Sequence, residues 1–334
     1  MLRWIKRVAI ALLLLTAAFV AVVLGLWRPR LWAASMGAPV TRRASANELQ
    51  FQVAALPWFR AVKLTQSPAN FETQSRLAQK LQALGWSVES QAVQHTSHAG
   101  NTDPKLASRS NNLIATKHLA DGPITVIAAH LDAVSKSPGA DDDGSGVAVL
   151  LELARLLSPE AASHVELCFF NEEENGLHGS NTFVEMLKPE ERARIRVAIV
   201  MDMVGAFDQR PHSQTYPPPL SWLAPDTGDF LSVIAITDAD ASVQALKRAR
   251  EKVAPELAME LFEPPRAIAE KFPDIWRSDH APFWQAKVPA IFLTDTGEFR
   301  TTRYHDPTDT ADALDYPRMA ALTDALLELL ESSK

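Results

Sequence analysis

The chain has 334 residues, of which 47% are hydrophobic and 22% are charged, and its formal net charge is −7. A chain of this length and apolarity can bury a large core, which excludes a globally disordered protein. The sequence has no basic stripe outside its N-terminus, which argues against nucleic acid as the main partner.

An apolar segment opens the chain. Residues 8–27, VAIALLLLTAAFVAVVLGLW, contain no charge, and a helix of that length, at about 1.5 Å per residue, crosses a hydrocarbon core of about 30 Å. Three basic residues precede the run, and Arg28 and Arg30 follow it, which favours a cytoplasmic N-terminus and a main domain outside the cytoplasm. A cleaved signal peptide is the alternative, but its apolar region is normally only about 7–15 residues long. We therefore expect residues 1–34 to anchor the protein to a lipid bilayer.

Residues 35–69 are expected to form a juxtamembrane linker and lead-in, and the main domain to occupy residues 70–334. Residues 70–84 have apolar side chains at helical spacing, and residues 86–93 alternate as a strand. A polar loop is expected at 95–110. Short apolar runs, typical of strands buried on both faces, follow at 113–116, 124–129, 165–170, 197–201, 231–237 and 290–293.

Helical patterns lie between these runs, at 146–157, 180–187, 242–252, 279–286 and 317–331. Residues 208–229 contain five prolines and no periodicity, which indicates a long loop. The alternation of strands and helices predicts an α/β fold. We expect a three-layer sandwich, in which helices cover both faces of a mixed, mostly parallel central sheet.

Acids and histidines follow the predicted strands, at the carboxyl ends where the chemistry of such folds gathers. His130 and Asp132 come directly after 124–129 and point to the same side of an extended chain. Asp132 can therefore hold the second nitrogen of a metal-bound His130. Asp141–Asp143 precede a helical pattern, where one aspartate would suffice as the N-cap and three in a row indicate a cation.

Further candidates follow downstream. Glu172–Glu174 come after the run at 165–170 and would repel each other without a cation or a proton between them. Asp202 ends the run AIVMD, and His305 lies in a polar loop near the end of the chain. Zinc accepts His nitrogen together with Asp or Glu oxygen, so this mixture favours zinc, although ligand type does not separate it from cobalt or manganese.

These motifs, taken in order, resemble the dizinc aminopeptidases, metallopeptidase family twenty-eight. The resemblance spans residues 70–330 and rests on AHLDAV, PGADDDGSGVA, EEENGLHGS, MDMVG, SDHAPF and YHDPTDT. It implies a zinc-exopeptidase architecture of the phosphorylase/hydrolase-like type. It also implies two zinc ions per chain, bridged by Asp142, with the ligands His130, Asp142, Glu174, Asp202 and His305.

The same resemblance implies the remaining roles. Glu173 matches the family's general base, because EENGLHGS aligns with the family's EE-x-G-x-x-GS. Asp132 would orient His130, and the peptide bond between Asp142 and Asp143 would be cis. Asp306 is a departure, since the family commonly has a small or uncharged residue after the histidine.

The resemblance implies a zinc aminopeptidase acting on peptides with a free N-terminus, and the apolar segment adds the expectation of a membrane-anchored, bacterial-type member with its catalytic domain on the periplasmic side. Tyr216 and Tyr304 are candidate donors to the oxyanion of the reaction. The alternatives are a single-zinc glutaminyl-peptide cyclotransferase, a carboxypeptidase-type member and a non-catalytic receptor or binding domain. Aromatic residues that could line a pocket for an apolar side chain, but more often form core, are Trp222, Phe262, Phe272, Trp276 and Phe299.

Overall fold

The computed structural model describes residues 30–35, 40–57, 60, 67–94, 110–216 and 224–332. The candidate anchor at 8–27, most of the expected loop at 95–110 and Trp222 lie outside the described residues. Among the helices of the described ranges, none combines the length and the apolarity that crossing a bilayer requires.

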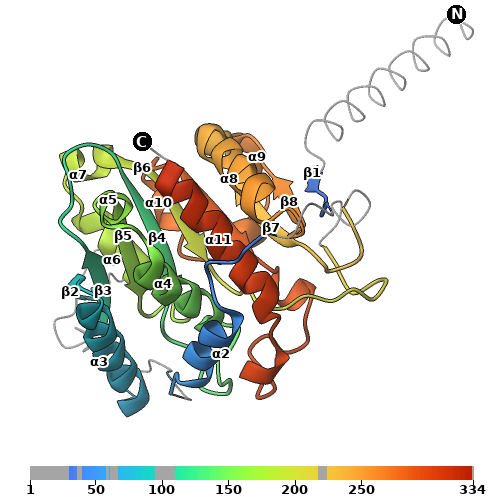
Figure 1. The fold of residues 1–334 in the computed structure, drawn as a ribbon, viewed down its shortest axis with the longest axis horizontal. Helices are drawn as coiled ribbons and strands as arrows, with labels where there is room; N and C mark the ends of the chain where they lie inside the picture. Colours follow the sequence, from blue (N-terminus) through green and yellow to red (C-terminus); the bar gives the residue numbers. More distant parts are fainter. Residues whose placement is uncertain are drawn as a thin grey trace, which may run out of the picture.

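A nine-stranded sheet forms the middle layer of the described domain (Figure 1). Its strand order is β1-β8-β7-β9-β6-β4-β5-β3-β2. Strands β5, β4, β6 and β9 run parallel to one another, whereas the pairs towards the two edges are antiparallel except for β7 with β8. The strands are β1 Arg30–Trp32, β2 Ser87–Ala92, β3 Asn111–Thr116, β4 Ile124–His130, β5 Val165–Phe170, β6 Ile195–Met201, β7 Leu231–Ala235, β8 Met259–Phe262 and β9 Ala290–Thr294.

Helices cover both faces of the sheet, and the alternation along β4 shows how. Ile127 and Ala129 belong to one core cluster with α2, α3, α4, α8 and α11, whereas Val126 and Ala128 belong to a second cluster with α6 and α10. Successive residues of a strand face opposite sides, so a strand buried on both faces needs apolar residues throughout. The predicted three-layer α/β sandwich with a mixed sheet is confirmed. The longer helices are α2 Ala46–Ala54, α3 Pro68–Ala83, α4 Gly144–Leu156, α6 His178–Met186, α8 Asp240–Val253 and α11 Tyr316–Ser332.

The shorter helices connect these layers, and their bounds are α5 Pro159–Ala162, α7 Pro189–Arg194, α9 Arg266–Ala269 and α10 Ala281–Gln285. Local sequence sets several helix starts. The Ser67 side chain accepts a hydrogen bond from the backbone N–H of Asn70 at the start of α3. Asp143 does the same for Gly146 at the start of α4. Such side chains replace the partners that the first N–H groups of a helix lack.

Strands β1 and β8, helix α2 and the short helices α5, α7 and α9 were not expected from the sequence. Helix α2 lies in the interval 35–69, expected as linker and lead-in, yet it packs against α4 and α11 and belongs to the folded domain. Strand β1 lies in the expected anchor segment and pairs with β8 at the sheet edge. Strand β8 reads MELF, and its central Glu260 interrupts the apolar run that would have signalled a buried strand.

Candidate metal centre and active site

The fold brings the sequence-predicted site residues to one edge of the sheet. His130 is the last residue of β4, Glu173 and Glu174 follow β5, and Asp202 follows β6. Because these three strands are parallel, their carboxyl ends meet at the same edge. His305 reaches that edge from the polar loop that follows β9.

Five of these side chains form two three-residue groups that share Asp142. One group is His130, Asp142 and Asp202, and the other is Asp142, Glu174 and His305. His130 Nε2 lies 3.1 Å from Asp142 Oδ1 and 3.7 Å from Asp202 Oδ1. His305 Nε2 lies 3.2 Å from Asp142 Oδ2 and 3.0 Å from Glu174 Oε2. Ligands about 2.1 Å from a tetrahedral zinc ion lie about 3.4 Å from one another, so the spacing fits zinc.

The chemistry of the donor set also fits a cation. Both ring nitrogens of His130 and Oδ2 of Asp142 are buried, and they make no hydrogen bond within the part of the chain that the structure describes. Burial lowers the pKa of His130, but the oxygens of Asp132, Asp142 and Asp202 outweigh it and raise that pKa well above 6.5. Burial and the charge of Asp142 raise the pKa of Glu174 to about 7. The cluster holds more negative charge than its surroundings can solvate, and a bound cation removes that excess.

Asp132 links the histidine to the acids that follow β5. Its Oδ1 lies 3.6 Å from His130 Nδ1 and accepts a hydrogen bond of 3.2 Å from the backbone N–H of Glu173. Its Oδ2 accepts from the backbone N–H of Glu174 at 3.3 Å. Asp132 is fully buried. One carboxylate thus lies beside a candidate ligand ring and binds the backbone of the two glutamates.

Glu173 lines the same cavity as Asp142, Glu174, Asp202 and His305. Burial raises the pKa of its carboxyl well above 4.5, and the neighbouring charge of Asp202 raises it further, against a lowering effect of His130. A carboxyl group that borders a metal site and holds its proton readily is suited to general acid–base chemistry.

The three consecutive aspartates, Asp141–Asp143, contact different groups. Asp143 caps α4, and its carboxylate also accepts hydrogen bonds from the backbone N–H groups of His130 at 3.0 Å and Met203 at 3.1 Å. Asp142 faces the two histidines, and its peptide bond to Asp143 is cis, as the resemblance implied. Asp141 turns away and accepts from the backbone N–H of Gly205 at 2.9 Å. Only the middle aspartate is directed at the candidate metal centre.

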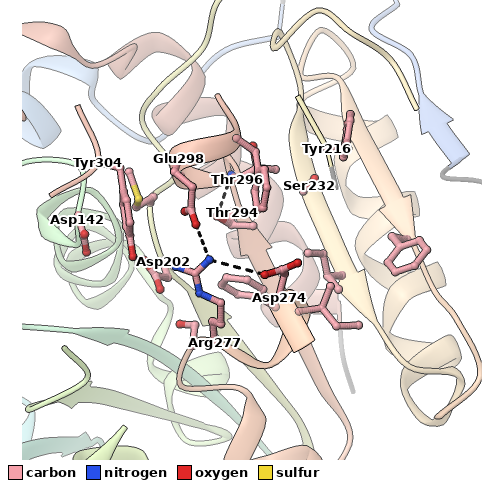
Figure 2. Close-up of a pocket in the computed structure, with 18 of the residues that line it drawn as sticks. Asp142, Asp202, Tyr216, Ser232, Asp274, Arg277, Thr294, Thr296, Glu298 and Tyr304 are labelled. Carbon is pink, nitrogen blue, oxygen red and sulfur yellow. Dashed lines mark hydrogen bonds and ion pairs between the residues drawn. The ribbon is translucent and has the colours of Figure 1, made fainter. Parts of the chain in front are cut away.

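The two tyrosines occupy different parts of the cavity. The ring of Tyr304 stacks on His305, with 3.8 Å between centroids and 19° between planes. Tyr216 lies away from the metal cluster, and its hydroxyl donates to Glu260 Oε2 at 2.6 Å. Figure 2 shows this separation, with Asp142 and Asp202 at one end of the cavity and Tyr216 at the other. Tyr304 is therefore next to the candidate metal centre, whereas the hydroxyl of Tyr216 is engaged elsewhere.

Sequence reasoning missed two residues that hold the metal-binding backbone in place. The buried carboxylate of Asp309 accepts hydrogen bonds from the backbone N–H groups of Asp141 at 2.8 Å and Asp142 at 3.3 Å. The buried guanidinium of Arg60 donates to the carbonyl oxygens of Leu131, Pro138 and Gly139. The position of Asp309 in YHDPTDT was a signal that could have been used, whereas Arg60 stands in no motif.

Within the Ser278–His280 run, Ser278 lines the cavity, whereas Asp279 and His280 are buried and do not line it. Asp279 accepts a hydrogen bond from the hydroxyl of Ser180, and His280 Nε2 lies 2.7 Å from the carbonyl oxygen of Ile275. The His280 ring stacks on Phe292, with 4.2 Å between centroids. His280 belongs to neither of the two candidate metal groups.

Comparison with known proteins places this site in a family. The model of peptidase family M28 matches residues 112–330. A protein of Escherichia coli, the uncharacterized protein YfbL, is 38% identical over 234 residues, which cover 67% of this chain and 71% of that protein. Aminopeptidase YwaD of Bacillus subtilis is 40% identical over 100 residues, which cover 29% of this chain and 22% of that protein.

Solved structures share the fold. The zinc aminopeptidase BSAP of Bacillus subtilis superposes with a TM-score of 0.64 at 17% identity, covering 88% of this chain and 96% of that one. A glutaminyl cyclase of Bacteroides thetaiotaomicron superposes with a TM-score of 0.63 at 18% identity, covering 89% of this chain and 100% of that one. The family model covers more than half of the chain and includes every candidate metal ligand, so this chain belongs to peptidase family M28.

Proposed function

We propose that the protein is a zinc-dependent aminopeptidase that removes the N-terminal residue of peptides. The observation that carries the proposal is the pair of three-ligand groups that share Asp142 and border one cavity with Glu173. Membership of a peptidase family and the aminopeptidases among its relatives support the same reaction class.

The proposed enzyme binds two zinc ions, one in each group of candidate ligands. Zinc ions bound there supply a Lewis acid for the scissile carbonyl and lower the pKa of water to about 7. Asp142 contributes one carboxylate oxygen to each group, because Oδ1 faces His130 and Oδ2 faces His305. Asp132 keeps the His130 ring in the orientation that presents Nε2 to the cavity.

Glu173 moves the proton in this mechanism. Its backbone is held by Asp132, and its buried carboxyl borders the space between the two groups of ligands. It takes a proton from the attacking water and delivers it to the leaving amine, which is general base followed by general acid catalysis. The carboxylates that remain in excess attract the protonated N-terminus of a peptide.

Hydrolysis of aminoacyl-p-nitroanilides by the full-length chain in detergent, with zinc measured in the same sample, tests this proposal. We expect zinc-dependent release that N-terminal acetylation of the substrate blocks. The Glu173→Gln variant should retain zinc and lose activity by about 100-fold or more. Glu185→Gln, an exposed change on α6 outside the cavity, is the matched control. Full activity in Glu173→Gln would refute the assignment of the general base.

Glutaminyl cyclases are the second candidate class, because they share this fold at a similar TM-score. A cyclase of the kind kept as an alternative in the sequence analysis uses one zinc ion. This chain instead has two groups of candidate ligands, each with its own histidine. Incubating the same preparation with peptides that begin with glutamine separates the two. Release of the N-terminal residue supports the peptidase, and cyclisation with one bound zinc would replace it with the cyclase.

We further propose that residues 8–27 anchor the protein in a membrane, with the catalytic domain on the periplasmic side. The support is the uncharged run and the basic residues that flank it. Fractionation of cells that express the full-length chain should place it in the membrane pellet after an alkaline carbonate wash. Recovery in the soluble periplasmic fraction without its N-terminal segment would instead show a cleaved signal peptide.

A further inference from the structure

The cavity, of about 140 Å³, extends from the candidate metal centre across the face of the sheet. Side chains of neighbouring strands form one wall of the cavity, and the strand register sets which of them lie side by side. Ser232 on β7 pairs with Glu260 on β8 and with Thr294 on β9, so these three polar side chains stand in one row across the strands. All three line the cavity. The Figure 2 close-up shows Ser232 and Tyr216 at the end opposite Asp142.

An apolar row lies beside the polar one. Ile234, two residues further along β7, pairs with Phe262 and Phe292 on the same two neighbouring strands, and all three line the cavity. Residues two apart on a strand face the same side, so both rows form a continuous surface. A ligand that crosses the cavity therefore contacts apolar side chains in one row and the Glu260 carboxylate in the next.

Glu260 is the unusual member of this surface. Its side chain is only 2% exposed, although it lines the cavity. Tyr216 donates to Oε2 at 2.6 Å, whereas Oε1 has no hydrogen-bond partner within the described part of the chain. A buried carboxylate oxygen without a partner costs free energy unless a ligand satisfies it. The fixed hydrogen bond to Tyr216 leaves Oε1 as the oxygen that can receive such a ligand.

The charge of the cavity lining beyond the candidate metal centre favours a cation. Away from the candidate metal ligands and Glu173, the charged residues of the cavity lining are Glu260, Asp274, Glu298 and Arg277. Arg277 forms an ion pair with Glu298 and lies 3.9 Å from Asp274, so its own charge is already balanced. The acids of this part of the lining outnumber the base, and a positive group entering it is attracted.

Arg300, the other cation near Glu260, does not line the cavity. Its buried guanidinium donates to the carbonyl oxygens of Ala206 and Phe230 and to the Gln214 side chain. Those bonds hold the chain behind the cavity wall, and no ion pair joins Arg300 to Glu260 among the described residues. Oε1 of Glu260 therefore accepts no hydrogen bond from Arg300, although the nearby positive charge of Arg300 lowers the pKa of the Glu260 carboxyl.

We propose that this end of the cavity binds the side chain of the substrate's N-terminal residue, and that Glu260 selects a long basic side chain, lysine or arginine. The inference rests on the proposed aminopeptidase function. Strand β8 lies three strands from β6, which carries Asp202, a lateral distance of about 14 Å at about 4.8 Å per strand. An extended lysine or arginine side chain is shorter than this span, so the Glu260 side chain must cover the remainder; a short side chain held at the metal end leaves the carboxylate out of reach.

Turnover of matched substrates gives the first arm of the test. The side chains of lysyl- and norleucyl-p-nitroanilide share an unbranched chain of four carbons, but norleucine lacks the terminal ammonium. For the wild-type, zinc-loaded, full-length chain we expect kcat/KM for lysine to exceed that for norleucine about 10- to 100-fold, the range of one charge-assisted hydrogen bond. Glu260→Gln should reduce that ratio to near one. Glu263→Gln, a change at a carboxyl group outside the cavity that pairs with Arg30, is the matched control.

Binding of the free amino acids gives a second arm that needs no turnover. Calorimetry with L-lysine and L-norleucine should show tighter binding of lysine to the wild-type chain, and Glu260→Gln should remove the difference. Hydrolysis of norleucyl substrate without a preference for lysine would overturn the inference and leave the proposed function standing. Tighter binding of lysine without hydrolysis of any substrate would uphold the inference and reject the function. An unchanged ratio in a folded Glu260→Gln variant would also overturn it.

Discussion

Replacing Asp132 by asparagine tests how the candidate metal centre is held. The carboxylate accepts two backbone hydrogen bonds, from Glu173 and Glu174, and lies 3.6 Å from His130 Nδ1. An asparagine keeps one oxygen, so its NH2 group must face one of these buried donors. One unsatisfied buried donor costs about 1–3 kcal/mol of the free energy of unfolding. The loss of the charge behind His130 should also weaken zinc binding about 10- to 100-fold.

Two measurements on Asp132→Asn separate these effects. Urea unfolding of the zinc-free protein reports the lost hydrogen bond, and competition with a chelator of known affinity reports the dissociation constant for zinc. Asp306→Asn is the control, because Asp306 also neighbours a candidate ligand but its side chain bonds only to Thr308 in the described structure. If Asp132→Asn binds zinc as tightly as the wild-type chain, Asp132 does not position His130 for the metal.

Three further predictions concern other parts of the site. His305→Ala removes one ligand group but leaves the group of His130 intact, so bound zinc measured by elemental analysis should fall from two ions to one; retention of both would contradict the ligand assignment. Arg60→Ala removes a guanidinium that binds four backbone carbonyls, and denaturant unfolding should show a loss of about 3 kcal/mol or more. Burial raises the pKa of Glu260 from 4.5 to about 7, with Tyr216 and Arg300 opposing the shift. The Glu260 carboxyl therefore stays protonated to a higher pH in the folded state than in the unfolded state. The stability that the protonated carboxyl contributes at low pH is lost as the pH rises from about 4.5 to 7. Glu260→Gln should gain up to about 3 kcal/mol relative to the wild-type chain between pH 4.5 and pH 8 in zinc-free unfolding experiments; a difference that does not vary with pH would contradict the shift.

The apolar pattern of the sequence was enough to predict the central strands. Strands β4 and β5 consist almost entirely of buried residues, and such runs have no competing structure in a chain that must cover both faces of a sheet. Strand β8 was missed because Glu260 breaks its apolar run. Helix α2 was missed because its packing partners, α4 and α11, lie about 100 residues or more away along the chain.

The candidate metal ligands were identified from motif order alone, and the fold brings all five together. Four of the ligands stand at or just after the end of a strand, or just before a helix, and parallel strands carry their carboxyl ends to one edge, whereas His305 joins them from a loop. Arg60 and Asp309 could not be chosen in the same way. They bind backbone groups of other segments, and every residue type has such groups, so the sequence does not indicate which ones will be bound.

The sequence by itself determined the α/β class, the order of the central elements and the residues that can bind zinc, because these depend on apolar periodicity and on side-chain chemistry near each strand end. Only the tertiary structure decided what forms the far end of the cavity. Glu260, Ser232 and Thr294 are separated by about 30 residues each along the chain. They form one surface because strand register, which is fixed by the packing of the whole sheet, places them side by side.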